Sequence, residues 1–117
     1  MPELDDQSLV DILLASRRAV SYSDTITEEY FSVDLNSQDI LIRQVTILGE
    51  AFRRLSSEFK EVHTELPYGI IIAMRNALVH DYDGIILSDV WLTIKNDLPR
   101  LILIVENILK NEYGIVL

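Results

Sequence analysis

One apolar repeat constrains the fold of this chain more than any other feature. Between positions 41 and 59, large apolar side chains recur in steps of four and three residues, the spacing of one face of an α-helix. The residues in this stripe are Leu41, Val45, Leu48, Phe52, Leu55 and Phe59. Asn36 or Ser37 is placed to cap its start. The pattern predicts an amphipathic helix of about six turns that packs against other helices.

The same spacing predicts helices on both sides of this one. A first helix is expected over residues 6–22, and residues 25–28 resemble a capping box that opens a short second helix. Near the C-terminus the repeat runs over residues 87–108 and passes Pro99 without losing phase. We expect one kinked helix there, because a proline at this position removes the hydrogen bond to the carbonyl of Lys95.

A further helix is predicted to start at Pro67, whose missing N–H costs nothing in a first turn. It would bury Ile71, Met74 and Leu78 and end near residues 83–84, an Asp-Gly turn signal. No alternation typical of β-hairpins competes with these helices. The fold class is therefore predicted to be all-α: an antiparallel up-and-down bundle of four long helices plus one short helix.

Length and composition narrow the setting. We expect a single domain over residues 1–117, since this length supports one core. The absence of cysteine excludes disulfides and thiolate chemistry. The acidic N-terminus lacks the basic start and apolar stretch of a signal peptide, and no apolar run approaches the roughly eighteen residues that cross a bilayer. We expect a cytoplasmic protein with no membrane association.

The net charge of -9 argues against an RNA-binding surface spread over the whole protein, because nucleic-acid binders normally show a basic footprint. Its distribution weakens that objection. Residues 1–36 hold eight acidic and two basic side chains, whereas residues 67–117 hold six and four. The negative charge is thus concentrated away from the segment that carries the most chemistry.

That segment is residues 75–82, where Arg75, Asn76, His80 and Tyr82 follow one another within eight positions. These groups suit a phosphodiester, because arginine binds phosphate oxygens and histidine moves protons near neutral pH. At about 100° per residue, Arg75 and His80 lie about 140° apart on a helix, so one continuous helix cannot aim both at one atom. Either the helix ends around His80 and turns the ring back, or two copies pool their motifs across a two-fold axis.

The Arg-x4-His-x-Tyr pattern in a short, helical, cysteine-free chain resembles the HepT-like branch of the HEPN superfamily, the toxin partners of minimal nucleotidyltransferases in prokaryotic toxin–antitoxin pairs. Other segments resemble this family in the same order along the chain: residues 11–13, 42–56, 66–68, 90–91 and 97–99. Tyr68 stands where the family usually has tryptophan, and Asp81 and Asp83 add negative charge around His80.

The resemblance implies a homodimer in which paired motifs line a cleft at the interface, with Arg75 and His80 as catalytic residues. It also implies a cognate minimal nucleotidyltransferase as antitoxin, with Tyr82 as the acceptor of AMP that silences the toxin. A phosphate on Tyr82 would bring negative charge into the cleft and compete for Arg75.

The chemistry can be written without a metal. We hypothesise that the RNA 2′-hydroxyl attacks the adjacent phosphate, with His80 as general base or acid and Arg75 stabilising the phosphorane. Asn76 would orient His80 or hold a phosphate oxygen. This mechanism predicts cleavage of RNA and not DNA, cyclic phosphate ends, and no metal or other cofactor.

Each residue also has a structural interpretation. Arg75 could form an ion pair with Asp81, Asp83 or Glu50, and His80 could be stabilised by the helix dipole alone. The alternative function is a non-catalytic nucleotide- or substrate-binding partner subunit of the nucleotidyltransferase, which the acidic charge favours. A purely structural helical dimer is a third possibility.

Two further residues carry expectations. Gly49 lies within a long predicted helix, where glycine costs roughly 1 kcal/mol relative to alanine, so we expect another helix to come close there. His63 is expected at the surface near a helix end, without a functional role.

Overall fold

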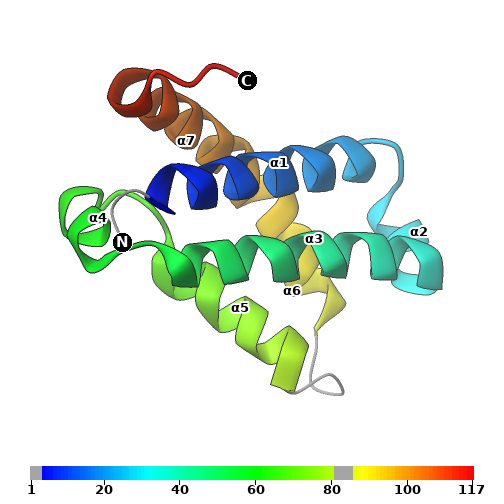
Figure 1. Cartoon of the computed structure of the whole chain (residues 1–117). Coiled ribbons are helices and arrows are strands. Elements are labelled where there is room, and N and C mark those ends of the chain that lie inside the picture. Colours follow the sequence, from blue (N-terminus) through cyan, green and yellow to red (C-terminus); the bar gives the residue numbers. More distant parts are fainter. Residues whose placement is uncertain (1–3, 81–85) are drawn as a thin grey trace.

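The chain folds into a bundle of helices, seen in a computed structural model that describes residues 4–80 and 86–117 (Figure 1). Its α-helices are α1 (Asp5–Ser23), α2 (Glu28–Val33), α3 (Leu35–Arg54), α4 (Ser57–Val62), α5 (Tyr68–His80), α6 (Leu87–Leu92) and α7 (Leu98–Tyr113), with a π-helical segment, Thr93–Asp97, between α6 and α7. No strand occurs in the described ranges. The prediction of an all-α fold with four long helices is confirmed: these are α1, α3, α5 and α7.

The four long helices pack in a definite order. α1 lies against both α3 and α7, and α3 in turn packs on α5 (Figure 1). The core is built from apolar side chains of these helices, among them Leu9, Ile12, Leu48, Phe52, Ile71, Leu98 and Leu101. Each such side chain contributes about 1.5–3 kcal/mol when it is fully buried. α5 lies at one side of the bundle, packed on α3 (Figure 1).

The stripe that predicted the long helix is correct in its first part, but the helix is shorter than expected. α3 ends at Arg54, and Leu55 adopts an extended backbone. The Ser56 hydroxyl accepts a hydrogen bond from the Phe59 N–H and so caps the separate helix α4. The buried Asp5 carboxylate of α1 accepts hydrogen bonds from both the Ser56 N–H (2.9 Å) and its hydroxyl (2.6 Å). These hydrogen bonds stabilise the non-helical connection between α3 and α4, although the apolar repeat continues through it.

Two predicted helix caps are also corrected. α3 is capped by Asp34 and not by Asn36 or Ser37. The hydroxyl and then the N–H of Ser37 donate to the Asp34 carboxylate, which lowers the pKa of Asp34 below its usual value. α2 is capped by Thr27, whose hydroxyl accepts the N–H of the third residue of that helix, and not by Thr25. In each case the N-cap is the residue immediately before the first helical residue, and its side chain accepts a backbone N–H of the first turn.

The C-terminal helix is continuous in the way the sequence predicted, with one local change. Helical backbone runs without a break from residue 87 to residue 113, and the change of geometry is the π-helical segment directly before α7. Pro99 is the second residue of α7 and has no N–H to donate to a backbone carbonyl in the preceding turn. That preceding turn is the π-helical segment, in which the backbone hydrogen bonds follow a different spacing. Gly114, at φ 67°, ends α7 in the left-handed conformation that glycine adopts readily.

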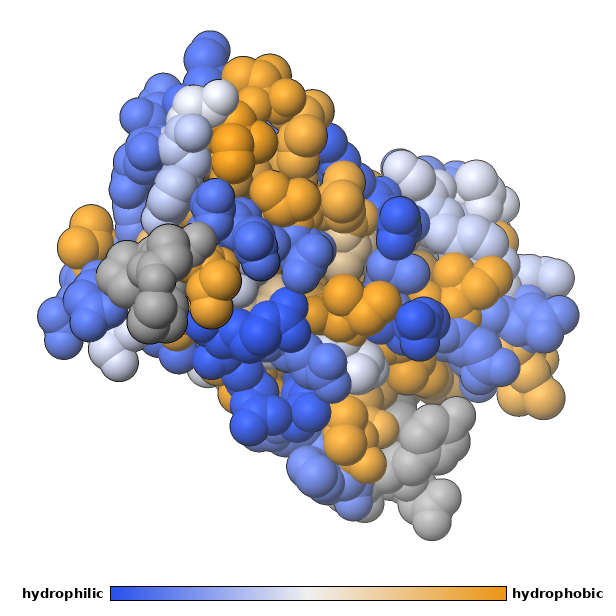
Figure 2. Space-filling view, in the orientation of Figure 1, coloured by the Kyte–Doolittle hydropathy of each residue, from blue (hydrophilic) through white to orange (hydrophobic). Residues whose placement is uncertain are grey.

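The surface shown in Figure 2 is mixed. Hydrophilic side chains gather over the C-terminal half of α3, and an apolar area lies at the top of the view, where the segment after α7 exposes Val116 and Leu117. Among the described helices, none is both long and apolar enough to cross a membrane.

Candidate functional site

The motif residues lie on α5, and the start of this helix is fixed by its own backbone. Pro67 directly precedes α5, one position earlier than a first-turn proline, and its carbonyl accepts the Ile71 N–H at 3.2 Å. Ile71 and Leu78 are buried as predicted, Met74 is only partly buried, and α5 packs on α3. Arg75, Asn76 and His80 are therefore carried by one helix whose position on the bundle is set by its apolar face.

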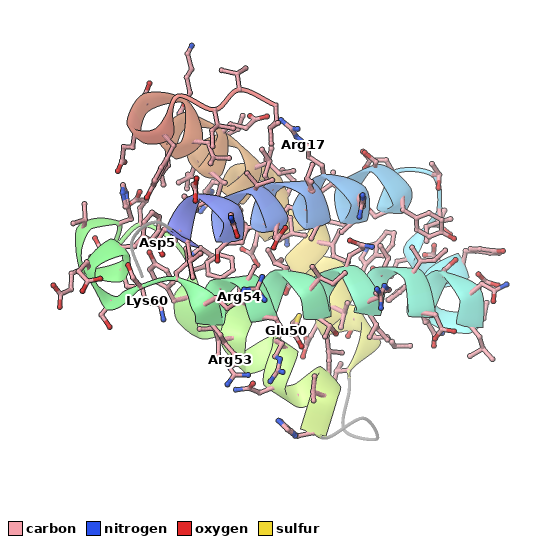
Figure 3. The ribbon with its side chains drawn as sticks, viewed as in Figure 1. Asp5, Arg17, Glu50, Arg53, Arg54 and Lys60 are labelled. Carbon is pink, nitrogen blue, oxygen red and sulfur yellow. The ribbon has the colours of Figure 1, made fainter. Side chains whose placement is uncertain are left out.

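Arg75 points inward, toward α3. Its side chain is only 11% exposed, and its Nη2 lies 3.2 Å from Oε1 of Glu50, which is 46% exposed. Figure 3 shows Glu50 on the side of α3 that faces α5, whereas Arg54 points the other way, toward its partner Asp11 on α1. Of the ion pairs considered from the sequence, the one with Glu50 is confirmed.

Gly49 explains how Arg75 comes so close to α3. A Cβ atom at position 49 would lie 2.1 Å from Cβ and 2.6 Å from Cγ of Arg75, distances that real atoms do not tolerate. The predicted close approach of another helix at Gly49 is confirmed. The neighbour is the aliphatic stem of Arg75 itself, which rests on the bare backbone of α3.

Asn76 contacts Arg75 as well. Its Oδ1 accepts a hydrogen bond from Arg75 Nη1 at 3.1 Å. Because a guanidinium only donates, the amide oxygen faces Arg75 and the amide NH2 group remains available to another acceptor. Within the described residues Asn76 thus contacts Arg75, and it makes no hydrogen bond to His80.

His80 is the last residue of α5 and is exposed. The helix is regular from Arg75 to His80, so the two side chains leave it about 140° apart, as the spacing predicted. No hydrogen bond or ion pair joins them within this copy of the chain. Asp81, Tyr82 and Asp83, together with the turn expected at 83–84, lie outside the described residues.

The outer side of α5 is apolar and forms one wall of a groove. A cavity of about 340 Å³ lies between α5 and the start of α6. It is lined by Ile70, Ala73, Met74, Ala77, Leu78, Ile86, Asp89 and Val90. Ile70 is 57% exposed and Ile86 is 58% exposed. An apolar partner in the groove would bury both side chains. α5 is thus apolar on two sides and covered on one.

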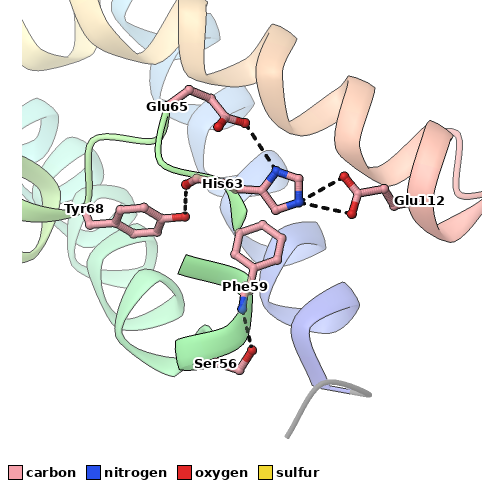
Figure 4. Close-up of polar contacts among 6 residues, drawn as sticks. All are labelled: Ser56, Phe59, His63, Glu65, Tyr68 and Glu112. Carbon is pink, nitrogen blue, oxygen red and sulfur yellow. Dashed lines mark hydrogen bonds and ion pairs between the residues drawn. The ribbon is translucent and has the colours of Figure 1, made fainter. Parts of the chain in front are cut away.

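A second polar cluster surrounds His63, and here the expectation was wrong. His63 is buried and not at the surface. Its Nδ1 lies 3.3 Å from Glu65, its Nε2 lies 3.0 Å from Glu112, and its ring stacks on Phe59 at 4.4 Å between centroids (Figure 4). No pattern along the chain predicts this cluster, because Glu112 is 49 positions away from His63.

Tyr68 completes the His63 cluster. Its hydroxyl donates a hydrogen bond to the backbone carbonyl of His63 (Figure 4). Burial, reinforced by the nearby carboxylates of Glu65 and Asp5, raises the pKa of Tyr68 to about 12. The tyrosine that replaces the family's usual tryptophan therefore holds the connection between α4 and α5 in place.

Metal-ligand geometry is not seen in the part of the chain that the structure describes: no three His, Cys, Asp or Glu side chains there are grouped so that they could hold an ion. The chemistry that the arrangement offers comes from the motif of α5. It consists of a guanidinium held at both of its terminal nitrogens, an amide beside it, and an exposed imidazole at the end of the same helix.

The structure is thus a small helical bundle that carries an Arg–Asn–His motif on one helix at its side. Comparison with known families identifies it: the family described as Ribonuclease HepT-like matches residues 12–108. The chain belongs to this family, and the resemblance noted from the sequence is confirmed.

Individual relatives agree with the family assignment. A probable ribonuclease HepT of Thermococcus cleftensis is 34% identical over 93 residues, which are 80% of this chain and 84% of that protein. A putative RNase of Methanocaldococcus jannaschii is 29% identical over 97% of this chain and 95% of its own length. A putative RNase of Caldanaerobacter subterraneus subsp. tengcongensis is 29% identical over 87% of this chain and 86% of its own. No solved structure gives a significant match.

Proposed function

We propose that this protein is a metal-independent endoribonuclease whose active site is formed by two copies of α5. The observation that carries the proposal is the divergence of Arg75 and His80. Arg75 packs against Gly49 and Glu50, while His80 is exposed on another face of the same helix. One copy does not bring the two groups together, and a second copy related by a two-fold axis supplies the missing partner for each.

The outer face of α5 supports a homodimer. α3 covers one apolar side of α5, and the outer side that faces the groove is apolar as well, a face that a helix normally buries against a partner. The groove lined by Ile70, Ala77 and Ile86 offers the second copy an apolar seat. Two α5 helices packed across this face would carry both copies of His80 and Asn76 toward a common cleft.

The proposed reaction is transfer of the RNA phosphodiester to its own 2′-hydroxyl. The bond between the 2′-oxygen and phosphorus forms, the bond to the 5′-oxygen breaks, and a cyclic phosphate and a 5′-hydroxyl result. His80 takes the proton of the 2′-hydroxyl, or gives one to the leaving 5′-oxygen. Arg75 stabilises the extra negative charge of the phosphorane, and the NH2 group of Asn76 binds a phosphate oxygen.

We further propose that the protein acts as the toxin of a prokaryotic toxin–antitoxin pair with a minimal nucleotidyltransferase as antitoxin. Transfer of AMP to Tyr82, two residues after His80, would place a phosphate next to the catalytic groups. The added charge would compete with RNA for Arg75. This part rests on the family resemblance and on the presence of the tyrosine in the sequence.

The experiment that tests the nuclease is incubation of the purified, unmodified protein with a defined RNA in the presence of a chelator, beside His80→Ala and Arg75→Ala. We expect cleavage by the wild type, with cyclic phosphate ends, and a loss of about a hundredfold or more in each variant. A substrate with a 2′-deoxy nucleotide at the cleavage position should resist. Absence of cleavage, with retained binding of a nucleotide, would instead favour the alternative of a non-catalytic partner of the nucleotidyltransferase.

A further inference from the structure

The guanidinium of Arg75 is held on one side by Asn76 of the motif and on the other by Glu50 of α3, which the motif does not include. Of its five N–H groups, one on Nη2 points to Glu50 and one on Nη1 to Asn76. The Nε atom is buried, and no described residue accepts a hydrogen bond from it. Among the described residues, one N–H on each terminal nitrogen has no acceptor, and two such N–H groups are what a phosphate accepts in a bidentate contact.

The contact of Arg75 with α3 is not one that stabilises the fold well. A glycine in the middle of a helix weakens it, and a buried N–H without a partner costs more than a hydrogen bond usually returns. Both features, Gly49 and Arg75 Nε, occur at the same contact. When several features that destabilise the fold occur at the same contact, the residues there commonly belong to a functional site.

The chain contains a second Arg–Glu pair that shows the difference. Arg17 of α1 and Glu106 of α7 lie 2.6 Å apart, with exposures of 32% and 37%. Neither side of that pair is enclosed. In the Arg75–Glu50 pair the arginine is enclosed and the carboxylate is not, so the carboxylate acts on a cation whose stem is already fixed by Gly49.

We propose that Glu50 is a positioning residue for Arg75. Gly49 allows the stem of Arg75 to lie on α3, and the Glu50 carboxylate fixes the rotation of the guanidinium so that its free edge points out of the bundle. An arginine side chain has many rotamers, and holding it in the productive one removes that entropy from the catalytic step. This inference rests on the proposed ribonuclease function, in which Arg75 stabilises the transition state.

The test compares Glu50→Ala, Glu50→Gln and Glu50→Asp with the matched control Glu106→Ala in the RNA cleavage assay. We expect kcat of Glu50→Ala to fall about tenfold to a hundredfold, with KM changed much less. Glu50→Asp should recover part of the rate, and Glu106→Ala should cleave like the wild type. In an Arg75→Ala background, Glu50→Ala should cause no further loss, because the group that it positions is absent.

A second measurement follows Arg75 without reference to activity. In the folded dimer, the NMR signal of the Arg75 Nε–H should be sharp and protected from exchange in the wild type and in Glu106→Ala. It should broaden or exchange faster in Glu50→Ala. An Arg75 signal that is equally protected in Glu50→Ala, or a Glu50→Gln variant that cleaves faster than the wild type, would overturn the inference.

The two failures are distinguishable. If the wild type shows no cleavage that depends on Arg75, the proposed function fails, and the positioning role in catalysis falls with it, whatever the NMR signal shows. If cleavage depends on Arg75 but Glu50→Ala keeps the kcat of Glu106→Ala, the function stands and the inference about Glu50 is wrong.

Discussion

His63 joins two parts of the bundle that are far apart in the sequence: its Nε2 lies 3.0 Å from a carboxylate oxygen of Glu112 in α7. Its other ring nitrogen faces Glu65, and the ring stacks on Phe59. Both carboxylates keep about half of their exposure while the imidazole is enclosed. The connection between α4 and α5, and with it the start of α5, is thereby tied to the C-terminal helix.

We predict that His63→Ala lowers the free energy of unfolding by about 1–3 kcal/mol, because a buried ring with two polar partners is lost. The measurement is urea denaturation at neutral pH. His80→Ala is the matched control, since His80 is exposed, and its effect should stay within about 0.5 kcal/mol. Equal losses in the two variants would contradict the role given to His63.

Tyr68 predicts a stability change at alkaline pH. Its pKa is raised from 10.0 to about 12 in the folded protein, first by burial. Below pH 10 both the folded and the unfolded states hold the proton; between pH 10 and 12 the unfolded state releases it while the folded state keeps it. Stability is therefore full below pH 10 and is lost as the pH rises toward 12.

The variant that checks this is Tyr68→Phe. At neutral pH it should be less stable than the wild type by about 1 kcal/mol, because the hydrogen bond to the His63 carbonyl is missing. The difference in unfolding free energy between the two proteins should shrink between about pH 10 and about pH 12. A difference that stays constant over this interval would show that Tyr68 does not titrate in this way.

Gly49 and Gly69 give opposite predictions for the same substitution. Gly49→Ala places a Cβ on the stem of Arg75, so we expect a loss of about 1–3 kcal/mol of stability together with reduced RNA cleavage. At Gly69 nothing lies within 4 Å of a new Cβ, and alanine there should stabilise α5 by up to about 1 kcal/mol. Thermal or urea unfolding of both variants decides the point. Gly49→Ala with unchanged stability and activity would contradict the close contact.

The long helices were predictable because their burial is periodic. A repeat of four and three residues reports which face of a helix is covered, and it placed α1 and α5 within a few residues of their bounds. It joined α6, the π-helical segment and α7 into one predicted helix. The same repeat misled at Leu55, since the apolar stripe continues across the break. There the hydrogen bonds between Ser56 and Asp5 decide the structure, and their partners are 51 positions apart.

For the candidate site, the sequence predicted the angle between Arg75 and His80 and included Glu50 among the possible partners of Arg75, but it did not predict the contact of Arg75 with Gly49. Helix geometry alone separated Arg75 from His80, and it left open whether the helix end turns the ring back or two copies combine their motifs. The glycine at position 49 indicated a close neighbour, yet nothing in the spacing named Arg75 as that neighbour. Contacts between helices depend on crossing angles and offsets, which a pattern within one segment does not contain.

If the proposed dimer forms through the outer face of α5, a single charged side chain introduced on that face should prevent the two copies from associating. Ile70→Glu places a carboxylate in the groove on the outer face of α5, so we expect the dimer to dissociate into monomers and to lose cleavage. Leu103→Glu is the control, because Leu103 is 64% exposed on α7. Sedimentation velocity reads the outcome directly. A dimer that survives Ile70→Glu and dissociates with Leu103→Glu would place the interface on the other side of the molecule.

A site shared between copies predicts that two inactive variants restore each other. Arg75→Ala retains His80, and His80→Ala retains Arg75, so a mixed dimer contains one complete pair if Arg75 of one copy works with His80 of the other. Random reassociation of an equal mixture should give mixed dimers in half of the molecules, each with one of two sites, and so about a quarter of wild-type cleavage. The mixture must be dissociated and reassociated before assay, with each variant alone treated in the same way as control. If the mixture stays as inactive as its parts while mixed dimers are seen by mass, Arg75 and His80 of the same copy act together, and the shared site is wrong.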